Sequence, residues 1–534
     1  MSEYGVQDFL IHITTLTQNL DSDKGMFLGC RMSFVIEVMQ ESADRPAFSL
    51  IGLHPGSRRS HARGDTFHVV PQGIRLNPLS HQISSRLDIH QASLHRGPEG
   101  LAARPVTIMI MSSVKHLGLL IALLGVLLMT SCDREGVSSQ ASTVDPIKVG
   151  ILHSKTGPLA ISEKAVIDAT ILAIEDVNDQ GGVLGRPLEP IVVDGSSNEN
   201  TFAREAADLL DHEGVSVIFG CWTSASRKAV RPVIESRDGL LFYPVQYEGL
   251  EQSPNIIYLG SAPNQQILPA VDWAMDELGA KRFLMVGSDY VFPRAANAII
   301  TDHIKARGGE AIGEYYITLG SRDTTEMIAA IKANPPDVIL NTINGDANIS
   351  FFKGLREAGI QASDVPTISF SIGEPELRSM SSSLVAGDYA AWNYFQSIPG
   401  QDNLGFVRKF GQRYHPRRVL SDPMQSAWNA VHLWAKAAEV AGSIEPAMVR
   451  RSLSSIEYQA PEGLVRIDPD TQHLWMKTRI GQITPARFFD IVWESNDSMR
   501  PVPYPSSRSR EDWDRFLQDL YAGWGERWSR PETP

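Results

Sequence analysis

One stretch of the chain combines a buried strand, a polar turn and the start of a helix, an arrangement that can bind a small molecule. Residues 215–219 are apolar and β-branched, which predicts a buried strand, and Ser224 or Ser226 can cap the helix that follows. Ligands of open α/β sheets bind at the carboxyl ends of strands, where the amides of the next helix are exposed. The sequence therefore predicts that Trp222, Thr223 and Ser224 contact a ligand. An ordinary turn between strand and helix is the alternative.

The elements that would hold this turn alternate regularly between strand and helix. A first series predicts strands at 147–152, 188–193, 215–219 and 240–243, with helices at 162–178 and 198–213. A second series predicts helices at 267–278, 294–307, 324–333 and 347–359, with strands at 282–286, 314–317, 337–341 and 367–371. Two such series indicate two doubly wound parallel-sheet lobes. We expect the chain to cross between them near 260–263, 392–396 and 459–464, forming a hinge that lets the lobes close.

Several blocks resemble the urea- and short-chain-amide-binding branch of the type I periplasmic binding proteins, the substrate-binding subunits of ABC importers. Besides the turn at Trp222, these blocks are residues 241–249 (LFYPVQYEG), 253–260 (SPNIIYLG), 262–265 (APNQ) and 287–294 (GSDYVFPR). The resemblance implies an α/β type I periplasmic-binding-protein fold with a three-strand hinge. It divides the chain into an N-terminal lobe (146–262 and 394–458), a C-terminal lobe (263–393 and 459–505) and a helical tail (506–534).

The resemblance also implies further ligand contacts. Tyr243 and Tyr247 match the family's Tyr-Pro-x-x-Tyr segment, and Tyr290 and Phe292 match a segment of the second lobe. Phe292 lacks the hydroxyl of the amide-binding variant, and Trp222 stands where that variant has tyrosine. Both departures favour urea, as do residues 341–346 (NTINGD) and 390–396 (AAWNYFQ). Core packing is the alternative role for the two tyrosines of the first lobe.

Urea offers four N–H donors and one carbonyl acceptor, so its site should be rich in acceptors. The carboxylates of Asp346 and Glu374 could accept the amide protons, and Ser224 or Ser371 could serve the rest. Either carboxylate could equally be a solvated turn residue. The resemblance implies a small neutral ligand and the permease subunits of an ABC transporter as partners.

Composition and motifs disfavour other classes of protein. The formal net charge of −13 over 534 residues disfavours nucleic acid as a partner. The three cysteines, Cys30, Cys132 and Cys221, are too scattered for a disulfide framework or a spaced metal site. No histidine lies near Cys221 in sequence, and the common nucleophile, phosphate-loop and dinucleotide motifs do not occur, so we expect no enzyme, cofactor or metal. A cytoplasmic amide sensor that regulates amidase expression and a branched-chain amino-acid binding protein are the alternatives.

The chain before residue 146 predicts export. Residues 1–108 hold seven of the 14 histidines without a regular period, and we interpret them as a disordered, non-native upstream extension; a histidine-rich metal-binding arm is the alternative. Start sites at Met109 or Met111 would precede a signal peptide (109–132), whose apolar run of residues 117–130 is too short to span a membrane. Its end resembles a bacterial lipobox, which implies lipidation of Cys132, a tether (133–145) and an extracytoplasmic membrane surface. Simple cleavage at a nearby site is the alternative.

Overall fold

The computed structural model describes residues 10–15, 34–39, 50–51 and 145–531. The chain divides into two units, residues 1–130 and 131–534. In the first unit, β1 (Leu10–Thr15), β2 (Phe34–Met39) and β3 (Leu50–Ile51) form an antiparallel sheet. The sequence pattern did not indicate these strands, because their β-branched runs are too short to show a period. The upstream extension, the signal peptide and the lipidation of Cys132 stay predictions, since residues 52–144 lie outside the described part.

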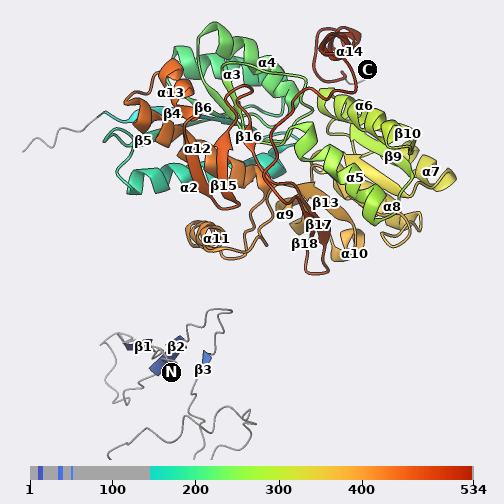
Figure 1. The fold of residues 1–534 in the computed structure, drawn as a ribbon, viewed down its shortest axis with the longest axis horizontal. Coiled ribbons are helices and arrows are strands. Elements are labelled where there is room, and N and C mark those ends of the chain that lie inside the picture. Colours follow the sequence, from blue (N-terminus) through green and yellow to red (C-terminus); the bar gives the residue numbers. More distant parts are fainter. Residues whose placement is uncertain (1–9, 16–33, 40–49, 52–144, 532–534) are drawn as a thin grey trace, which may run out of the picture. The chain divides into compact units, whose positions relative to one another are not determined.

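The first lobe is built on a parallel five-stranded sheet of order β5-β4-β6-β7-β8 (Figure 1). Its apolar strands are covered on both faces, because α2 packs on α12 on one side and α3 on α4 on the other. The strands are β4 (Ile147–His153), β5 (Leu188–Asp194), β6 (Ile218–Gly220), β7 (Leu241–Tyr243) and β8 (Ile256–Tyr258). The helices are α2 (Ala160–Asp179), α3 (Glu199–Asp211), α4 (Ser224–Ser236), α11 (Gln401–Arg413), α12 (Asp422–Ala441) and α13 (Pro446–Leu453).

The second lobe is built on a seven-stranded sheet of order β10-β9-β11-β12-β13-β17-β18. The strands from β10 to β13 are parallel, and β17 pairs antiparallel with both β13 and β18. Its strands are β9 (Arg282–Ser288), β10 (Glu310–Ile317), β11 (Val338–Thr342), β12 (Thr367–Ser369), β13 (Tyr389–Trp392), β17 (Arg479–Ile483) and β18 (Phe489–Glu494). Its helices are α5 (Ile267–Glu277), α6 (Val291–Ala306), α7 (Thr325–Ala333), α8 (Ala347–Glu357), α9 (Glu374–Arg378) and α10 (Ser382–Val385). Two parallel-sheet lobes confirm the predicted fold class.

The chain crosses between the lobes three times, and the third crossing differs from the prediction. The first follows β8 through the short helix η2 (Pro263–Gln265), and the second follows β13. The strands β14 (Glu457–Ala460), β15 (Gly463–Ile467) and β16 (Leu474–Trp475) form a small antiparallel sheet. Val465, Ile467 and Met476 lie in the core of the first lobe, so the third crossing follows Met476 rather than residues 459–464. A strand pattern alone cannot show which of two cores a strand joins.

The C-terminal tail contains one helix, α14 (Arg510–Gly523). Its Trp513 and Leu517 lie in the core of the second lobe, together with residues of α6. In Figure 1 the helix lies at the end of the chain near α6. The residues that follow α14 contact Glu199 of α3 and the chain at the start of α6.

Candidate ligand site between the lobes

The turn at the start of α4 is capped by Thr223, and the prediction that Ser224 or Ser226 is the cap is wrong. The backbone of Thr223 is extended, so its Oγ1 turns back and accepts a hydrogen bond from the Ser226 amide at 3.0 Å. Ser224 is already helical, and its hydroxyl donates to Glu248 and accepts from Arg227 Nη1 at 3.1 Å. The hydroxyl of Ser224 therefore faces the loop after β7.

Cys221 lies at the end of β6 and fits no role as a nucleophile. Its side chain is fully buried, and burial raises the pKa of its thiol far above the ordinary range. Its φ of +66° places it in the left-handed region, which forms the bend that leads from the strand to Trp222.

The two tyrosines of the first lobe are held by their own lobe. Tyr243 Oη donates to the carbonyl oxygen of Trp222 at 2.7 Å, which fixes the turn before α4. Tyr247 Oη donates to the Glu251 carbonyl at 3.1 Å and contacts His473, and its ring stacks on Tyr258 with centroids 5.1 Å apart. Tyr243 thus supports the predicted site directly, whereas Tyr247 is packed in the core behind it.

A buried ionic cluster behind these tyrosines was missed by sequence reasoning. Arg227 has a fully buried side chain; its Nε lies 2.8 Å from Glu251 and its Nη2 lies 3.2 Å from Glu248. The guanidinium also lies over the rings of Tyr247 and Tyr243, 4.4 and 4.8 Å from their centroids. Burial alone would lower the pKa of Arg227, but the two glutamates raise it well above its ordinary value. The sequence offered one signal for this cluster: Arg227 follows the turn at Trp222, and Glu248 lies in the block 241–249, so two motifs each contain a charged residue.

Side chains of the second lobe reach this cluster from the start of α6. Tyr290 is the residue before the helix and is 2 % exposed; its ring centroid lies 6.2 Å from that of Phe292. Burial raises the pKa of Tyr290 well above its ordinary value, and the nearby Tyr243 and Glu248 raise it further. Ala225 of α4 lies in the same core as both rings. The structure therefore brings the starts of α4 and α6 together.

Gln246 connects the first lobe to Ser371 of the second. Its Nε2 donates to the Phe370 carbonyl at 2.7 Å and to Ser371 Oγ at 3.3 Å. Its Oε1 is buried and has no hydrogen-bond partner among residues 145–531. A buried acceptor of this kind is uncommon in folded proteins and needs an explanation.

Glu163 presents a second acceptor of the same kind. Its Oε2 accepts from the Ser154 amide at 2.8 Å and lies 3.0 Å from His153 Nδ1, while its Oε1 has no partner in the described part of the chain. Glu163 also contributes to the raised pKa of Cys221, which places it near the end of β6. Sequence reasoning missed both Glu163 and Gln246. The signal for Glu163 was its position in the first turn of a helix that follows a strand end.

Asp346 and Glu374 lie outside this cluster. Asp346 forms an ion pair with Arg322, and its side chain is 22 % exposed. Glu374 Oε1 accepts from the Gln396 amide at 2.7 Å near the second crossing. Burial, reinforced by Glu376 and Asp422, raises the pKa of Glu374 to about 8. At neutral pH the group is therefore mostly protonated, so the carboxylate that the sequence analysis assigned to the ligand is largely missing.

Comparison with known proteins identifies the family. Residues 147–510 match the periplasmic binding protein domain family. The chain belongs to this family. As a member of this family it is a periplasmic substrate-binding protein, and the family implies an extracytoplasmic location. No helix in the described residues is long and apolar enough to cross a membrane.

Relatives of this periplasmic binding protein are distant in sequence. The Leu/Ile/Val-binding protein homolog 6 of Brucella melitensis is 22% identical over 367 residues, covering 66% of this chain and 90% of the relative. A solute binding protein of an ABC transporter from Rhodopseudomonas palustris BisB5, solved with 3,4-dihydroxy benzoic acid, is 21% identical, with a TM-score of 0.61 over 67% of this chain and 99% of that one. A branched-chain amino acid transporter substrate binding protein from Streptococcus pneumoniae, solved with isoleucine, is 18% identical, with a TM-score of 0.56 and shares of 67% and 100%. The two structures show the shared fold.

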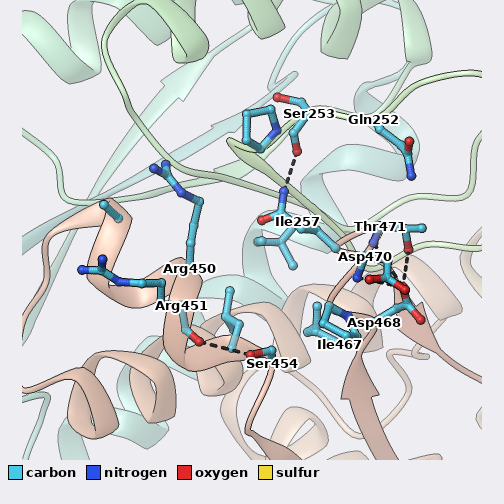
Figure 2. A pocket seen from close by; sticks show the side chains of 15 residues that line it. Gln252, Ser253, Ile257, Arg450, Arg451, Ser454, Ile467, Asp468, Asp470 and Thr471 are labelled. Carbon is cyan, nitrogen blue, oxygen red and sulfur yellow. Dashed lines mark hydrogen bonds between the residues drawn. The ribbon is translucent and has the colours of Figure 1, made fainter.

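A hollow of this periplasmic binding protein is lined by none of the predicted site residues (Figure 2). It has a volume of about 680 Å³, and its lining comes from residues 252–257, 447–454 and 467–472. Two of its charged groups have partners: Arg450 Nη2 donates to Asp238 at 2.8 Å, and Asp468 accepts from Arg500 at 2.8 Å. Arg450 Nη1 is buried and has no partner among the described residues. It contains residues of one lobe only. The cluster between the lobes is the stronger candidate for a ligand site.

Proposed function

We propose that the chain is the substrate-binding protein of an ABC importer and captures urea or a short-chain amide between its two lobes. The observation that carries the proposal is that Glu163 Oε1 and Gln246 Oε1, two of the buried acceptors in the described part of the chain, have no hydrogen-bond partner there. A buried polar atom without a hydrogen bond costs about 1–3 kcal/mol. A ligand with several N–H groups removes that cost, and urea has four such groups.

Size and charge support the same ligand class. Ser224, Tyr290 and Ser371 are 1, 2 and 3 % exposed, so a ligand that touches all three is enclosed and small. The charges of the inner cluster balance, since Arg227 and Lys228 face two glutamates. A neutral ligand therefore suits the site better than an aromatic carboxylate, whose oxygens would meet further acceptors.

A branched-chain amino acid is the second candidate. The names of several relatives favour it, and its ammonium group would supply three N–H donors to the same acceptors. The cytoplasmic amide sensor is disfavoured by the family's extracytoplasmic location and by the predicted signal peptide. Attachment to the membrane through Cys132 is part of our proposal, as are the permease subunits.

Isothermal calorimetry with urea, formamide, acetamide and leucine tests the ligand. The best small ligands gain at most about 1.5 kcal/mol per non-hydrogen atom, so urea should bind with about 6 kcal/mol, a Kd in the tens of micromolar. Heat from leucine together with no heat from urea or the amides would reject the urea proposal and leave the family assignment intact.

Replacing Ser224 with alanine should weaken urea binding about 5- to 150-fold. The change removes a hydroxyl at the start of α4 that the proposal assigns to the ligand, at a cost of about 1–3 kcal/mol. Ser236→Ala at the exposed end of the same helix is the control and should leave the Kd unchanged. Asp346→Ala should cost less than Ser224→Ala, because Arg322 already holds that carboxylate. Equal Kd values for Ser224→Ala and the control would reject this site assignment.

Replacing Cys132 with alanine should release the protein from the membrane fraction or block its maturation. A thiol at the end of a signal peptide becomes the lipidated N-terminus in the lipoprotein interpretation. Fractionation and the mass of the N-terminal peptide measure the result. A native protein that carries no lipid, together with unchanged fractionation of the variant, would favour simple cleavage.

A further inference from the structure

Residues 527–530, which follow α14, form a segment that we call the C-terminal strap. The helix before it is fastened to the second lobe: Trp513 is buried in that lobe's core, and Arg508 donates to Asp302 of α6 at 2.7 and 3.0 Å. The ring of Tyr521 packs on that of Trp528 with centroids 4.6 Å apart. The strap therefore starts from a fixed point on the second lobe.

The strap binds the backbone beside Tyr290. The Trp528 carbonyl accepts from the Val291 amide at 2.9 Å, and Ser529 pairs with Tyr290 as an isolated antiparallel bridge. The Arg530 amide donates to the Asp289 carbonyl at 3.1 Å. Tyr290 provides no side-chain cap for α6, so the strap satisfies an amide in the first turn of that helix. It thus holds the chain that carries Tyr290 and Phe292.

The same strap also reaches the first lobe. Glu199 is the first residue of α3, and its two carboxylate oxygens accept from the Trp528 amide at 3.3 Å and from Ser529 Oγ at 3.4 Å. Lys228 Nζ of α4 lies 5.0 Å from the centroid of the Trp528 ring. Trp528, Ser529 and Arg530 together therefore touch α3 and α4 of one lobe and the start of α6 of the other.

We propose that the C-terminal strap is a latch that ties the two lobes together beside the ligand site. The three crossings form the hinge, and the strap is a separate connection that does not belong to it. If the lobes open by rotation about the hinge, α3 and α6 separate and the contacts of Glu199 with the strap break. The latch then slows both the entry and the release of the ligand. The proposal rests on the proposed function only in using urea as the probe.

Two variants of the full chain remove the latch in different ways. One ends at Gly525 and lacks the strap; the other is Glu199→Ala, which removes only the acceptor on α3. Glu205→Ala is the matched control, because Glu205 lies on the same helix and forms its ion pair with the neighbouring Arg204. Small-angle X-ray scattering without ligand measures the separation of the lobes, and stopped-flow tryptophan fluorescence measures the rate of urea release.

We expect the shortened chain to have a larger radius of gyration and to release urea about tenfold faster, and Glu199→Ala to release it about threefold faster, as expected for the loss of one or two hydrogen bonds. Entry should become faster as well, which distinguishes a latch from ordinary damage to the site. An unchanged radius of gyration in both variants, or release rates within the error of the control, would overturn the proposal. If urea binds to none of the proteins, the proposed ligand fails, and the scattering comparison still decides on the latch.

Discussion

Replacing Arg227 with methionine is expected to lower the free energy of unfolding by about 3–5 kcal/mol. The side chain is fully buried, and so are the carboxylates of Glu248 and Glu251 that it joins. Burial favours the neutral form of Glu251, but Arg227 and Lys228 hold its pKa well below its usual range, so it stays ionised. Methionine fills much of the volume of the arginine side chain. It leaves the negative charges of Glu248 and Glu251 without their main partner, in a region without water contact.

A matched control lies one helical turn away from Arg227. Arg231 is 41 % exposed, pairs with Glu235 at 3.1 Å and lies 3.6 Å from Glu251, so Arg231→Ala should cost less than about 1 kcal/mol. Guanidinium chloride denaturation is the measurement, because urea is the proposed ligand. Adding Glu248→Gln to Arg227→Met should recover part of the loss, since Lys228 then still pairs with Glu251 at 3.1 Å. A loss of less than 1 kcal/mol for Arg227→Met would show that the cluster does not stabilise the fold.

The sequence predicted the alternating elements well because each rests on a local pattern. The strand at residues 147–152 and the helix at 162–178 were predicted from the spacing of their apolar residues, and tertiary contacts left both elements nearly as predicted. The third crossing was misplaced because β15 joins the core of the first lobe through Val465 and Ile467, a choice that depends on distant residues. Local patterns therefore determine the elements but not the lobe that each element joins.

The residues of the candidate site were predicted by two routes. Trp222 was predicted because it follows the end of a strand, and Tyr290 because of the family resemblance. The structure places Ala225, close to Trp222 in sequence, in one core with Tyr290, and their contact with a ligand stays a prediction. Glu163, Arg227 and Gln246 were missed because a charged or amide side chain in a helical or loop pattern is usually solvent-exposed. Arg227 and Glu163 are buried by other elements of the first lobe, and Gln246 by the second lobe. A local sequence pattern contains none of these contacts.

The free energy of unfolding is expected to fall as the pH rises from about 5 to 8. Four buried carboxyls have folded-state pKa values of about 7 or 8, raised by burial from ordinary values near 4: Glu374, Asp388, Asp422 and Glu462. Between the ordinary and the raised pKa the folded state binds more protons than the unfolded state, so stability decreases with pH. His473 has the opposite effect, because burial lowers its pKa to about 3, and its contribution to stability grows as the pH rises toward 6.5. Between pH 5 and 8 the four carboxyls together change the free energy of unfolding more than His473 does.

Glu374→Gln should therefore stabilise the protein by about 4 kcal/mol at pH 8 and by less than about 1 kcal/mol at pH 5. Glutamine keeps an oxygen that can accept from the Gln396 amide, and it has no charge to bury. The control is Glu357→Gln, because that side chain is 68 % exposed and pairs with Lys353 at 3.6 Å. Guanidinium chloride denaturation at pH 5, 6.5 and 8 provides the comparison.

The same variant decides whether Glu374 touches the ligand. In a carboxyl that is mostly protonated at pH 7, one oxygen carries the proton and donates a hydrogen bond, and Oε1 of Glu374 already accepts from the Gln396 amide. Glu374→Gln should therefore leave the Kd for urea within about twofold. Loss of urea binding without a change in the pH profile would instead assign Glu374 to the ligand as an ionised acceptor. A flat stability profile between pH 5 and 8 would contradict the raised pKa values, and with them the physical reason for separating Glu374 from the site around Ser224.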